Sequence, residues 1–444
     1  MPITEGNEIV KCEGADGSKK LEYGGKVILA PMVRIGTLPM RLLALQYGAD
    51  IVYSEELIDW KLLRSRRVEN QILGTVDYVD ETDGTVIFRT HPKLERHQVV
   101  LQVGTSDPQR ALQVAKKMEG DVDGIDINMG CPKEFSLKGG MGAALLYKPD
   151  TVKEILETLV KNIPRKAISC KIRVLEDLED TLALCRIIEN TGVVALAIHG
   201  RTKKERPQYP NRNDVISRIS QQLKIPIIAN GGSKEIKCFE DIEKFREVCG
   251  TSSVMLARAA MWNCSIFRKD GMLPLHDVIR DYLRLCVDFD SQATNVKYVI
   301  QNMIGELQSE TSWGRTFLGA QTLEEICAVW ELDEYWKEKQ KEFGAQLHQG
   351  SVAGAMAEMG SCRNRVIEMP ATFLRKHYKD TELPNCRKSW DQPIYETRQE
   401  EKIFRSIVTL NGMKFTSLPG IDANAFDPKG PLQHHEADEP SRPC

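Results

Sequence analysis

The chain has 444 residues, a formal net charge of −3, 41% hydrophobic residues and 28% charged residues. It exceeds what one compact core usually holds, so we expect two to three domains. The balance is that of an ordinary globular protein and excludes a chain too polar or too charged to fold.

No segment of the sequence reads as a targeting or membrane segment. Residues 1–20 lack the apolar core of a signal peptide and the Arg/Ser-rich character of a mitochondrial presequence, and no apolar run reaches about 18 residues. The 12 cysteines include no CxxC pair. We therefore expect a soluble, intracellular protein with reduced core thiols, no membrane contact, no disulfide framework and no metal.

An N-terminal extension, residues 1–25, precedes a repeated pattern over residues 26–270. Short β-branched runs alternate there with amphipathic stretches, and the runs are VILAPM, DIVYSEEL, VVLQVG, GIDINMG, ISCKIR, VVALAIHG, IPIIANGG and SSVMLARAA. Near-continuous apolar runs suit strands buried on both faces, and most gaps are long enough for crossover helices. The pattern predicts an α/β fold, a closed (β/α)8 TIM barrel, with VIFRT at 86–90 as a small insertion strand.

Polar residues fall at or near the carboxyl ends of these runs. They are Glu56, Gln102, Asn128, Lys171, His199, Asn230 and Arg258. In a closed barrel these ends converge on one face, where the active site lies. This placement favours the barrel over its competitor, a doubly wound open sheet.

The sequence after the barrel divides into further regions. Residues 271–338 have helical periodicity and predict a small helical domain, and residues 339–361 predict a linker. Residues 362–417 contain three alternating runs, with an Asn411-Gly412 turn that indicates a β-hairpin. The Pro-rich tail, 418–444, has too few apolar residues for a core and is expected to be disordered.

Charge is unevenly distributed along the chain. Residues 361–417 carry a net charge of +4, against −4 for residues 1–360 and −3 for the tail. A basic segment on a slightly acidic body is compatible with binding a polyanion, and a solvated surface explains it equally well. The residues that would form the basic face are Arg363, Arg365, Arg375, Lys376 and Lys379.

Several motifs in a fixed order carry a family resemblance. The segments LAPMVRIGTLPMRLLALQYGAD, LQVGTSD, GIDINMGCPK, KGGMGAALL, CKIR, AIHGR, PIIANGG and ARAAMWN resemble the tRNA-dihydrouridine synthase family. The C-terminal region resembles the double-stranded-RNA-binding-like module of the eukaryotic branch that modifies position 20 of cytoplasmic tRNA. The resemblance implies FMN-dependent, NADPH-driven reduction of a tRNA uridine to 5,6-dihydrouridine by a cytoplasmic enzyme, which we expect to be a monomer.

The module is incomplete against that family pattern. PATFLRKHYKDTEL, 370–383, can supply its first helix, because Phe373, Leu374 and Tyr378 fall at helical spacing. No basic second helix follows Ser417, so we expect a partial α+β module whose stability and RNA affinity are both reduced.

Cys131 is the candidate proton donor. Saturating the uracil double bond requires a hydride at carbon 6, which no side chain donates, and a proton at carbon 5. A thiol, with an ordinary pKa of about 8.5, is protonated at pH 7 yet able to release its proton. The resemblance implies this role for Cys131, and the surrounding glycines would let the loop bring the thiol to the base.

The resemblance also implies residues for the cofactor and the substrate. The residues implied for FMN are Pro31, Met32, Val33, Arg34, Glu56, Gln102, Lys171, His199, Asn230, Gly231, Gly232, Ala257 and Arg258. Asn128, Arg173 and Arg201 are implied as contacts to the substrate nucleotide. Phosphate sites after strands seven and eight are common in TIM barrels, because backbone N–H groups converge there.

Two other functions stay open at this point. The first is a barrel flavoenzyme that acts on a free small molecule, which would not need a basic appendage. The second is a catalytically inactive RNA-binding protein, against which Cys131, Lys171, His199 and Arg258 argue.

Overall fold

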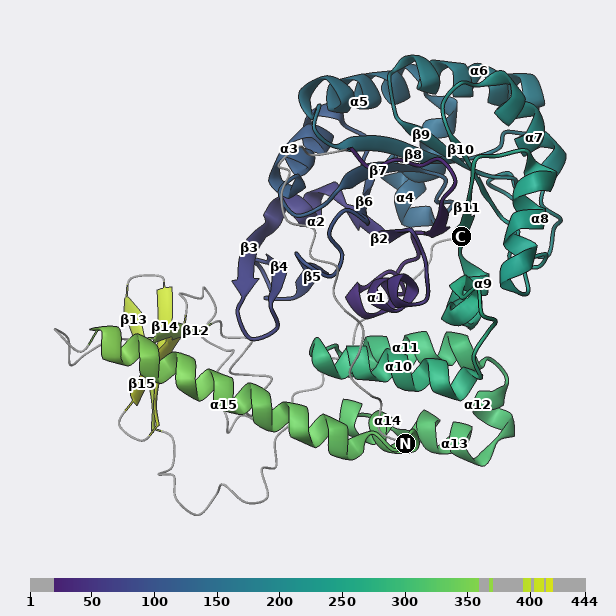
Figure 1. The fold of residues 1–444 in the computed structure, drawn as a ribbon. Coiled ribbons are helices and arrows are strands. Elements are labelled where there is room, and N and C mark those ends of the chain that lie inside the picture. The colour runs from purple at the N-terminus through teal and green to yellow at the C-terminus, as the bar shows by residue number, and fades with distance from the viewer. Residues whose placement is uncertain (1–19, 359–366, 370–393, 401–402, 411–412, 418–444) are drawn as a thin grey trace, which may run out of the picture. The chain divides into compact units, whose positions relative to one another are not determined.

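The eight apolar runs form the eight strands of a closed parallel barrel in a computed structural model of the chain (Figure 1). Around the barrel the order is β1-β11-β10-β9-β8-β7-β6-β2. The strands are β1 (Val27–Leu29), β2 (Ile51–Ile58), β6 (Val99–Gly104), β7 (Gly124–Met129), β8 (Ala167–Arg173), β9 (Ala195–His199), β10 (Ile227–Asn230) and β11 (Ser253–Leu256). The predicted (β/α)8 barrel is confirmed, and the doubly wound alternative is wrong.

The structure describes residues 20–358, 367–369, 394–400, 403–410 and 413–417. Within these ranges no helix is long and apolar enough to cross a membrane. The N-terminal residues 1–19, the predicted helix over 370–383, the basic face, the hairpin turn and the tail from 418 lie outside the described residues.

Helices follow the strands and lie outside the barrel (Figure 1). They are α1 (Leu38–Gln46), α3 (Pro108–Met118), α5 (Pro149–Asn162), α6 (Leu178–Asn190), α7 (Asn213–Gln222), α8 (Phe239–Cys249) and the short α9 (Arg258–Trp262). Local signals start several of them: Asp107 accepts from the N–H of Arg110, and Asp177 accepts from those of Glu179 and Asp180. Their apolar faces pack on the outward-facing strand residues in the main hydrophobic core.

The inside of the barrel changes from apolar to polar along the strands. A separate buried cluster that includes Ile28, Ile51, Tyr53, Val100 and Met255 fills its lower part. Successive strand residues point to opposite faces, so every second residue beyond these apolar positions also points into the barrel. The register pairs Gln102 with Asp126, Asn128 with Lys171, Arg173 with His199, and His199 with Asn230. The polar residues therefore form the upper layers of the barrel interior.

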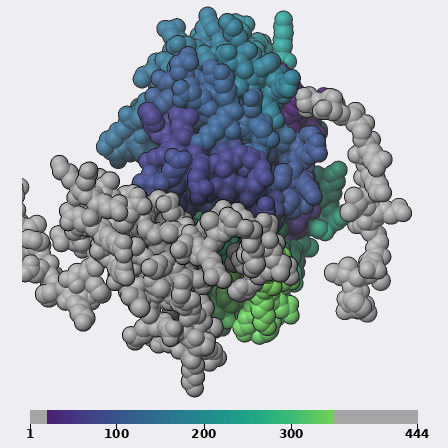
Figure 2. All heavy atoms as spheres, turned by 90° about the vertical axis from the view of Figure 1, so that its left-hand side faces the viewer, coloured from purple at the N-terminus to yellow at the C-terminus, as the bar shows by residue number. Residues whose placement is uncertain are grey.

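An insertion follows β2 and is larger than the sequence indicated. After α2 (Asp59–Arg64), strands β3 (Ser65–Asn70), β4 (Thr75–Asp80) and β5 (Val86–Thr90) form an antiparallel three-stranded sheet. The sequence analysis predicted only the last of these strands, because the first two are polar and lack an apolar run. Figure 2 shows the purple-to-indigo residues of this part of the chain at the surface, beside the blue residues that follow them.

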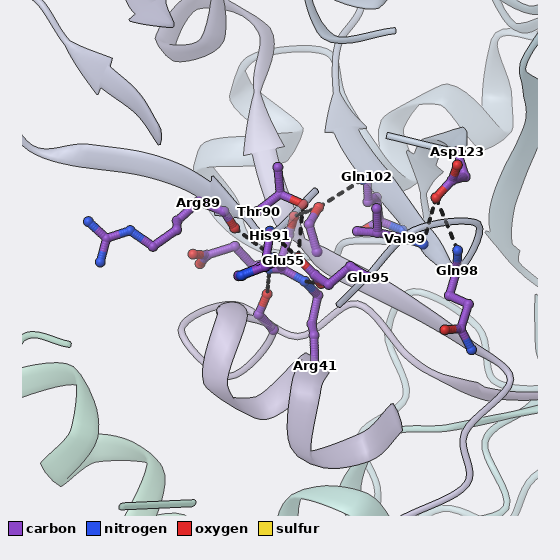
Figure 3. Close-up of polar contacts among 12 residues, drawn as sticks. Arg41, Glu55, Arg89, Thr90, His91, Glu95, Gln98, Val99, Gln102 and Asp123 are labelled. Carbon is purple, nitrogen blue, oxygen red and sulfur yellow. Dashed lines mark hydrogen bonds and ion pairs between the residues drawn. The ribbon is translucent and has the colours of Figure 1, made fainter. Parts of the chain in front are cut away.

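A buried ion pair connects α1 to the segment between the insertion and β6. Arg41 and Glu95 are 1% and 0% exposed, and the guanidinium donates from Nε to Oε1 (2.5 Å) and from Nη2 to Oε2 (2.9 Å). The remaining groups are satisfied, since Arg41 also donates to the carbonyls of Gly36 and Arg89, and Thr90 donates to Glu95 (Figure 3). A bidentate ion pair with additional hydrogen bonds can offset the free-energy cost of burying both charges.

Helices follow the barrel and pack against it. They are α10 (Leu275–Asp288), α11 (Ala293–Ile304), α12 (Leu307–Glu310), α13 (Ser312–Gly319) and α14 (Leu323–Val329), in agreement with the predicted helical domain. The next helix, α15 (Asp333–Glu358), runs through most of the segment predicted as a linker, so this connection is helical. The prediction of a linker followed from Gly344, Gly350 and Gly354, which interrupt the apolar pattern of this segment.

A separate compact unit comprises residues 82–84 and 351–444. Its described part is a four-stranded sheet of order β12-β15-β14-β13, with β12 (Ile367–Met369), β13 (Ile394–Glu400), β14 (Ile403–Leu410) and β15 (Met413–Ser417). The three predicted strands are present, β13 and β15 both pair antiparallel with β14, and β12 adds a parallel edge that the sequence analysis missed.

Removing one member of the buried ion pair should destabilise the protein strongly. We expect Glu95→Gln to lower the free energy of unfolding by about 3 kcal/mol or more, because it leaves the Arg41 guanidinium buried without a counter-charge. Urea unfolding of the variant and the wild type measures the difference. The matched control is Glu69→Gln, whose exposed pair with Arg67 should contribute less than about 1 kcal/mol. Equal stability of both variants would contradict the argument.

Candidate active site

A chain of hydrogen bonds crosses the floor of the site and ends at the thiol loop. Gln102 donates to Asp126 Oδ2 (2.8 Å) and accepts from Asn128 Nδ2 (2.9 Å). Asn128 Oδ1 in turn accepts the backbone N–H groups of Gly130 and Cys131, both at 2.9 Å. Asp126, Gln102 and Asn128 are all buried. Three neighbouring strand residues therefore fix the backbone from which Cys131 projects.

The lower end of this chain is anchored in the barrel interior. Ser169 donates to Asp126 Oδ1 (2.8 Å), and the hydroxyls of Tyr23 and Tyr53 lie 3.4 Å and 3.3 Å from Ser169 Oγ. Burial raises the pKa of Asp126 to about 6, while the hydrogen bond from Gln102 opposes the shift. A rotation of Gln102 would therefore leave Asp126 Oδ2 and Asn128 Nδ2 without these hydrogen bonds.

The thiol of Cys131 faces a buried acid rather than a base. The carboxylate of Glu56, which is 8% exposed, and the hydroxyl of Ser136 both influence the titration of its sulfur. Ser136 Oγ donates to Glu56 Oε1 (3.3 Å), and a Cβ on Gly142 would lie within 3.0 Å of both Ser136 Oγ and Cys131 Cβ, so the three residues are close neighbours. Burial and then the charge of Glu56 raise the pKa of Cys131 to about 11. Cys131 is therefore protonated at neutral pH. A proton donor requires this form, whereas a nucleophile requires the thiolate.

The loop after Cys131 is compact around that thiol. Short helix α4 (Glu134–Lys138) is followed by the 3-10 helix η1 (Gly142–Tyr147). Its first residue, Gly142, has a φ of +56°. A Cβ at Gly142 would lie 2.6 Å from the Cys131 carbonyl oxygen and 2.7 Å from Ser136 Oγ. The glycine allows both the left-handed turn and the close approach.

A group of basic side chains from the ends of three strands, β8, β9 and β11, lies near the thiol loop, where Arg173 donates to the Gly130 carbonyl. Its members are Lys171, Arg173, His199, Arg201 and Arg258, and each has a lowered pKa. Burial lowers the pKa of Lys171 to about 8, with a further contribution from the charge of Arg173. Burial and then the charge of Arg201 lower the pKa of Arg173 to about 10. Crowded, partly desolvated cations favour an anionic ligand.

Hydrogen bonds define the state of His199 and the orientation of both arginines. Arg201 Nη1 lies 3.0 Å from His199 Nε2 and donates to the carbonyl of Gly231 (2.9 Å). A guanidinium can only donate, so Nε2 accepts and the neutral imidazole carries its proton on Nδ1. Burial and the neighbouring cations lower the pKa of His199 far below its ordinary value, consistent with that neutral form. Arg173 donates to the carbonyls of Gly130 and Thr202.

The turn after β10 forms a narrow cradle beside these cations. Asn230 donates to the Met255 carbonyl (2.8 Å), and Gly231 follows with φ +118°. A Cβ on Gly231 would overlap Asn211 Oδ1, and one on Gly232 would lie 2.5 Å from the Phe245 ring. Asn211 Oδ1 is buried and has no hydrogen-bond partner among the described residues. Ala257 and Arg258 lie at the adjacent end of β11, where α9 begins.

The loop after β1 has one feature that the family resemblance did not imply. Pro31 and Met32 are half-buried and Val33 is exposed, but Arg34 turns its side chain toward α11. Its guanidinium donates to the Thr294 carbonyl and to Asn295, and lies 4.0 Å over the Tyr298 ring. Its backbone, at φ +66°, donates to Glu55. Arg34 thus ties this loop to the helical domain.

Among the described residues, no group of three or more His, Cys, Asp or Glu side chains is placed to hold a metal ion. The site instead combines an acidic thiol environment on one side with a cationic, glycine-lined cradle on the other. An anionic group with hydrogen-bonding edges fits such a site.

Comparisons with known proteins agree with this geometry. A family model described as Dihydrouridine synthase (Dus) matches residues 28–346. The chain belongs to this family.

Two yeast relatives are named tRNA-dihydrouridine(20) synthase. The protein of Schizosaccharomyces pombe is 39% identical over 70% of this chain and 66% of its own length, so the match leaves about a third of that protein uncovered. The protein of Saccharomyces cerevisiae is 39% identical over 64% of this chain and 78% of its own length. A mouse tRNA-dihydrouridine(20a/20b) synthase-like protein is 32% identical over 56% of this chain and 71% of its length.

Sequence reasoning missed three residues of this family member's site. Asp126 had a signal, since a charged residue two positions before Asn128 shares its inward phase. Ser136 and Asn211 had none, because they reach the site from the short helix α4 and from a loop, whose positions depend on tertiary packing.

We expect Lys171→Met to weaken cofactor binding while it stabilises the cofactor-free protein. Removing a desolvated cation should raise the unfolding free energy of the cofactor-free protein by about 1–3 kcal/mol at pH 7, because the lowered pKa of Lys171 shows that folding disfavours its charge. Flavin content, measured by absorbance after purification, should fall. Lys204→Met, an exposed neighbour, is the control and should change neither quantity. A destabilised variant with full flavin would contradict the assignment.

Proposed function

We propose that this chain reduces a uridine of tRNA to 5,6-dihydrouridine, using FMN and NADPH, with Cys131 as the proton donor. The observation that carries the proposal is the position of Cys131 at the carboxyl end of β7, where Asn128 holds its backbone and Arg173 binds the preceding carbonyl, so that a thiol and basic side chains share one barrel mouth. Family membership supports the reaction class.

The residues present fit FMN. The unpartnered Asn211 Oδ1 can accept a hydrogen bond from a ligand, and the cation cluster supplies positive charge for a phosphate. We assign Gly231, Gly232, Ala257 and Arg258 to the phosphate. Pro31, Met32, Val33, Gln102, Lys171, His199 and Asn230 are assigned to the remainder of the cofactor. FMN, when bound, supplies the hydride that uracil carbon 6 receives, and NADPH restores it.

The chain's own residues would supply orientation and a proton. Cys131 donates its proton to carbon 5 of the uracil, and the Asp126–Gln102–Asn128 chain keeps the thiol loop in place during the transfer. The Lys171 ammonium stabilises negative charge in the site, where partial burial strengthens its field.

A uridine in folded tRNA must leave its stack to reach this site, at a cost of a few kcal/mol. Contacts to the RNA backbone offset that cost, and we assign Asn128, Arg173 and Arg201 to the everted nucleotide. We propose position 20 of the D-loop as the target, by similarity to the two yeast proteins of that name. We further propose that the protein acts as a monomer on cytoplasmic tRNA.

The two alternatives are less well supported. A barrel flavoenzyme acting on a free small molecule would not require family motifs shared with tRNA-modifying relatives over 28–346. An inactive RNA-binding protein would not need to retain Cys131 with its acid neighbour and the cation cluster.

Cys131→Ala tests the proposal. We expect a variant with normal flavin content and a rate of dihydrouridine formation lowered by about 100-fold or more, because the proton donor alone is removed. Unmodified tRNA is incubated with the protein and NADPH, and mass spectrometry of its nucleosides measures the gain of two hydrogens per uridine. Cys238→Ser, at a half-buried thiol that caps α8 away from the barrel interior, should remain fully active. A colourless wild-type protein that leaves tRNA unchanged would refute the function.

A further inference from the structure

The side chain of Glu56 points into the barrel, although strict alternation along β2 would turn it outward. Strict alternation along β2 from the inward-facing Tyr53 would point Glu55 into the barrel. A bulge between Tyr53 and Glu56 inserts one extra residue, so Glu56 instead pairs in register with Gln102. The bulge therefore aims the Glu56 carboxylate into the site, and there it meets the Cys131 thiol and the Ser136 hydroxyl.

The surroundings leave little space for Glu56 to point elsewhere. Its Oε1 lies 3.3 Å from Ser136 Oγ and would lie 2.9 Å from a Cβ on Gly104. The same Ser136 Oγ would lie 2.7 Å from a Cβ on Gly142, and Cys131 Cβ would lie 3.0 Å from that same point. Two glycines thus let carboxylate, hydroxyl and thiol gather in one small buried volume.

The proposed reaction leaves a chemical problem that these residues can solve. Each turnover transfers the Cys131 proton to uracil carbon 5 and leaves a thiolate beside the Glu56 carboxylate. Two adjacent anions are unfavourable in a partly desolvated site, so the next proton to arrive is bound strongly. Cys131 is half-buried, so bound RNA that covers it would keep water from the thiolate unless a relay supplies the proton.

We propose that Glu56, with Ser136, is a proton relay that returns a proton to Cys131 after each turnover. The carboxylate takes a proton from water, and the resulting carboxyl group passes it to the thiolate, directly or through the Ser136 hydroxyl, which accepts one proton as it donates another. The charges balance: water loses the proton that the thiolate gains, and Glu56 and Ser136 return to their initial states. The inference rests on the proposed function and makes Glu56 a positioning residue that acts through Cys131.

The charged groups around the relay are arranged for this direction of transfer. Glu56 is the acid next to the thiol, whereas Lys171 and Arg173, on the neighbouring strand β8, interact electrostatically with Cys131. Those cations attract negative charge on the sulfur once it forms, and the carboxyl group is the nearest proton source. Burial raises the pKa of Glu56, which makes its carboxyl form accessible closer to neutral pH.

Glu56→Gln tests the relay by separating the first turnover from later ones. The first turnover uses the proton already on the sulfur, so enzyme pre-reduced with NADPH and present in excess over tRNA should form dihydrouridine at a rate within about threefold of wild type. With excess tRNA and NADPH, the steady-state rate should fall by about tenfold or more. The rate of flavin reduction by NADPH, measured separately, should be unchanged. Glu134→Gln, an exposed acid on the same loop, is the matched control and should resemble wild type in every assay.

A second measurement does not depend on activity. Replacing the Glu56 carboxylate should lower the pKa of Cys131 by about one unit and increase its alkylation by iodoacetamide at pH 8 roughly tenfold, followed on the Cys131 peptide by mass spectrometry. If Glu56→Gln does not fold, Glu56→Ser carries the same pair of tests, because it also removes the charge that raises the pKa of Cys131.

Each outcome of these experiments either supports or overturns the proposed relay. Unchanged steady-state turnover, or an equal loss in the first and later turnovers, would overturn the relay, and so would an unchanged alkylation rate. Failure of the wild-type protein itself to modify tRNA would refute the proposed function instead, while the alkylation experiment would still report on the contact between Glu56 and Cys131.

Discussion

The closed ring of parallel strands, held in one register, is the constraint on which the rest of this structure depends. Closure makes every inward-facing side chain a neighbour of two others, so a residue at the carboxyl end of one strand meets its counterparts on the next. Gln102 can bridge Asp126 and Asn128 only because β6 and β7 pair in that register. A slip by one residue would turn the whole chain of hydrogen bonds outward.

The electrostatics of the site divide along the same ring. On the β2 and β7 side, burial and a neighbouring acid raise the pKa of the Cys131 thiol. On the side formed by β8, β9 and β11, burial and neighbouring cations lower the pKa values of Lys171, Arg173 and His199, which favours the binding of a negatively charged group. A proton donor and basic side chains thus lie on neighbouring strands at the barrel mouth, an arrangement suited to delivering a proton while negative charge develops nearby.

The parts outside the barrel act on this site in different ways. The Arg41–Glu95 pair connects α1 to the segment before β6, and its contribution is to stability. Arg34 instead links the loop after β1 to α11 through Asn295 and Tyr298, so the helical domain helps to set the position of a loop assigned to the cofactor. The helical course of α15 shows that a connection rich in glycine can still be regular.

The sequence by itself determined the eight strands, the convergence of their polar ends and the thiol in a glycine-rich loop. These follow from local patterns: β-branched runs, period-two alternation and glycine spacing, which act over a few residues. Only the tertiary structure decided that Glu56 rather than Glu55 enters the site, because a bulge in β2 reverses the alternation. It also decided the places of Ser136, Asn211 and Arg34, since each is positioned by contacts with residues remote in the chain.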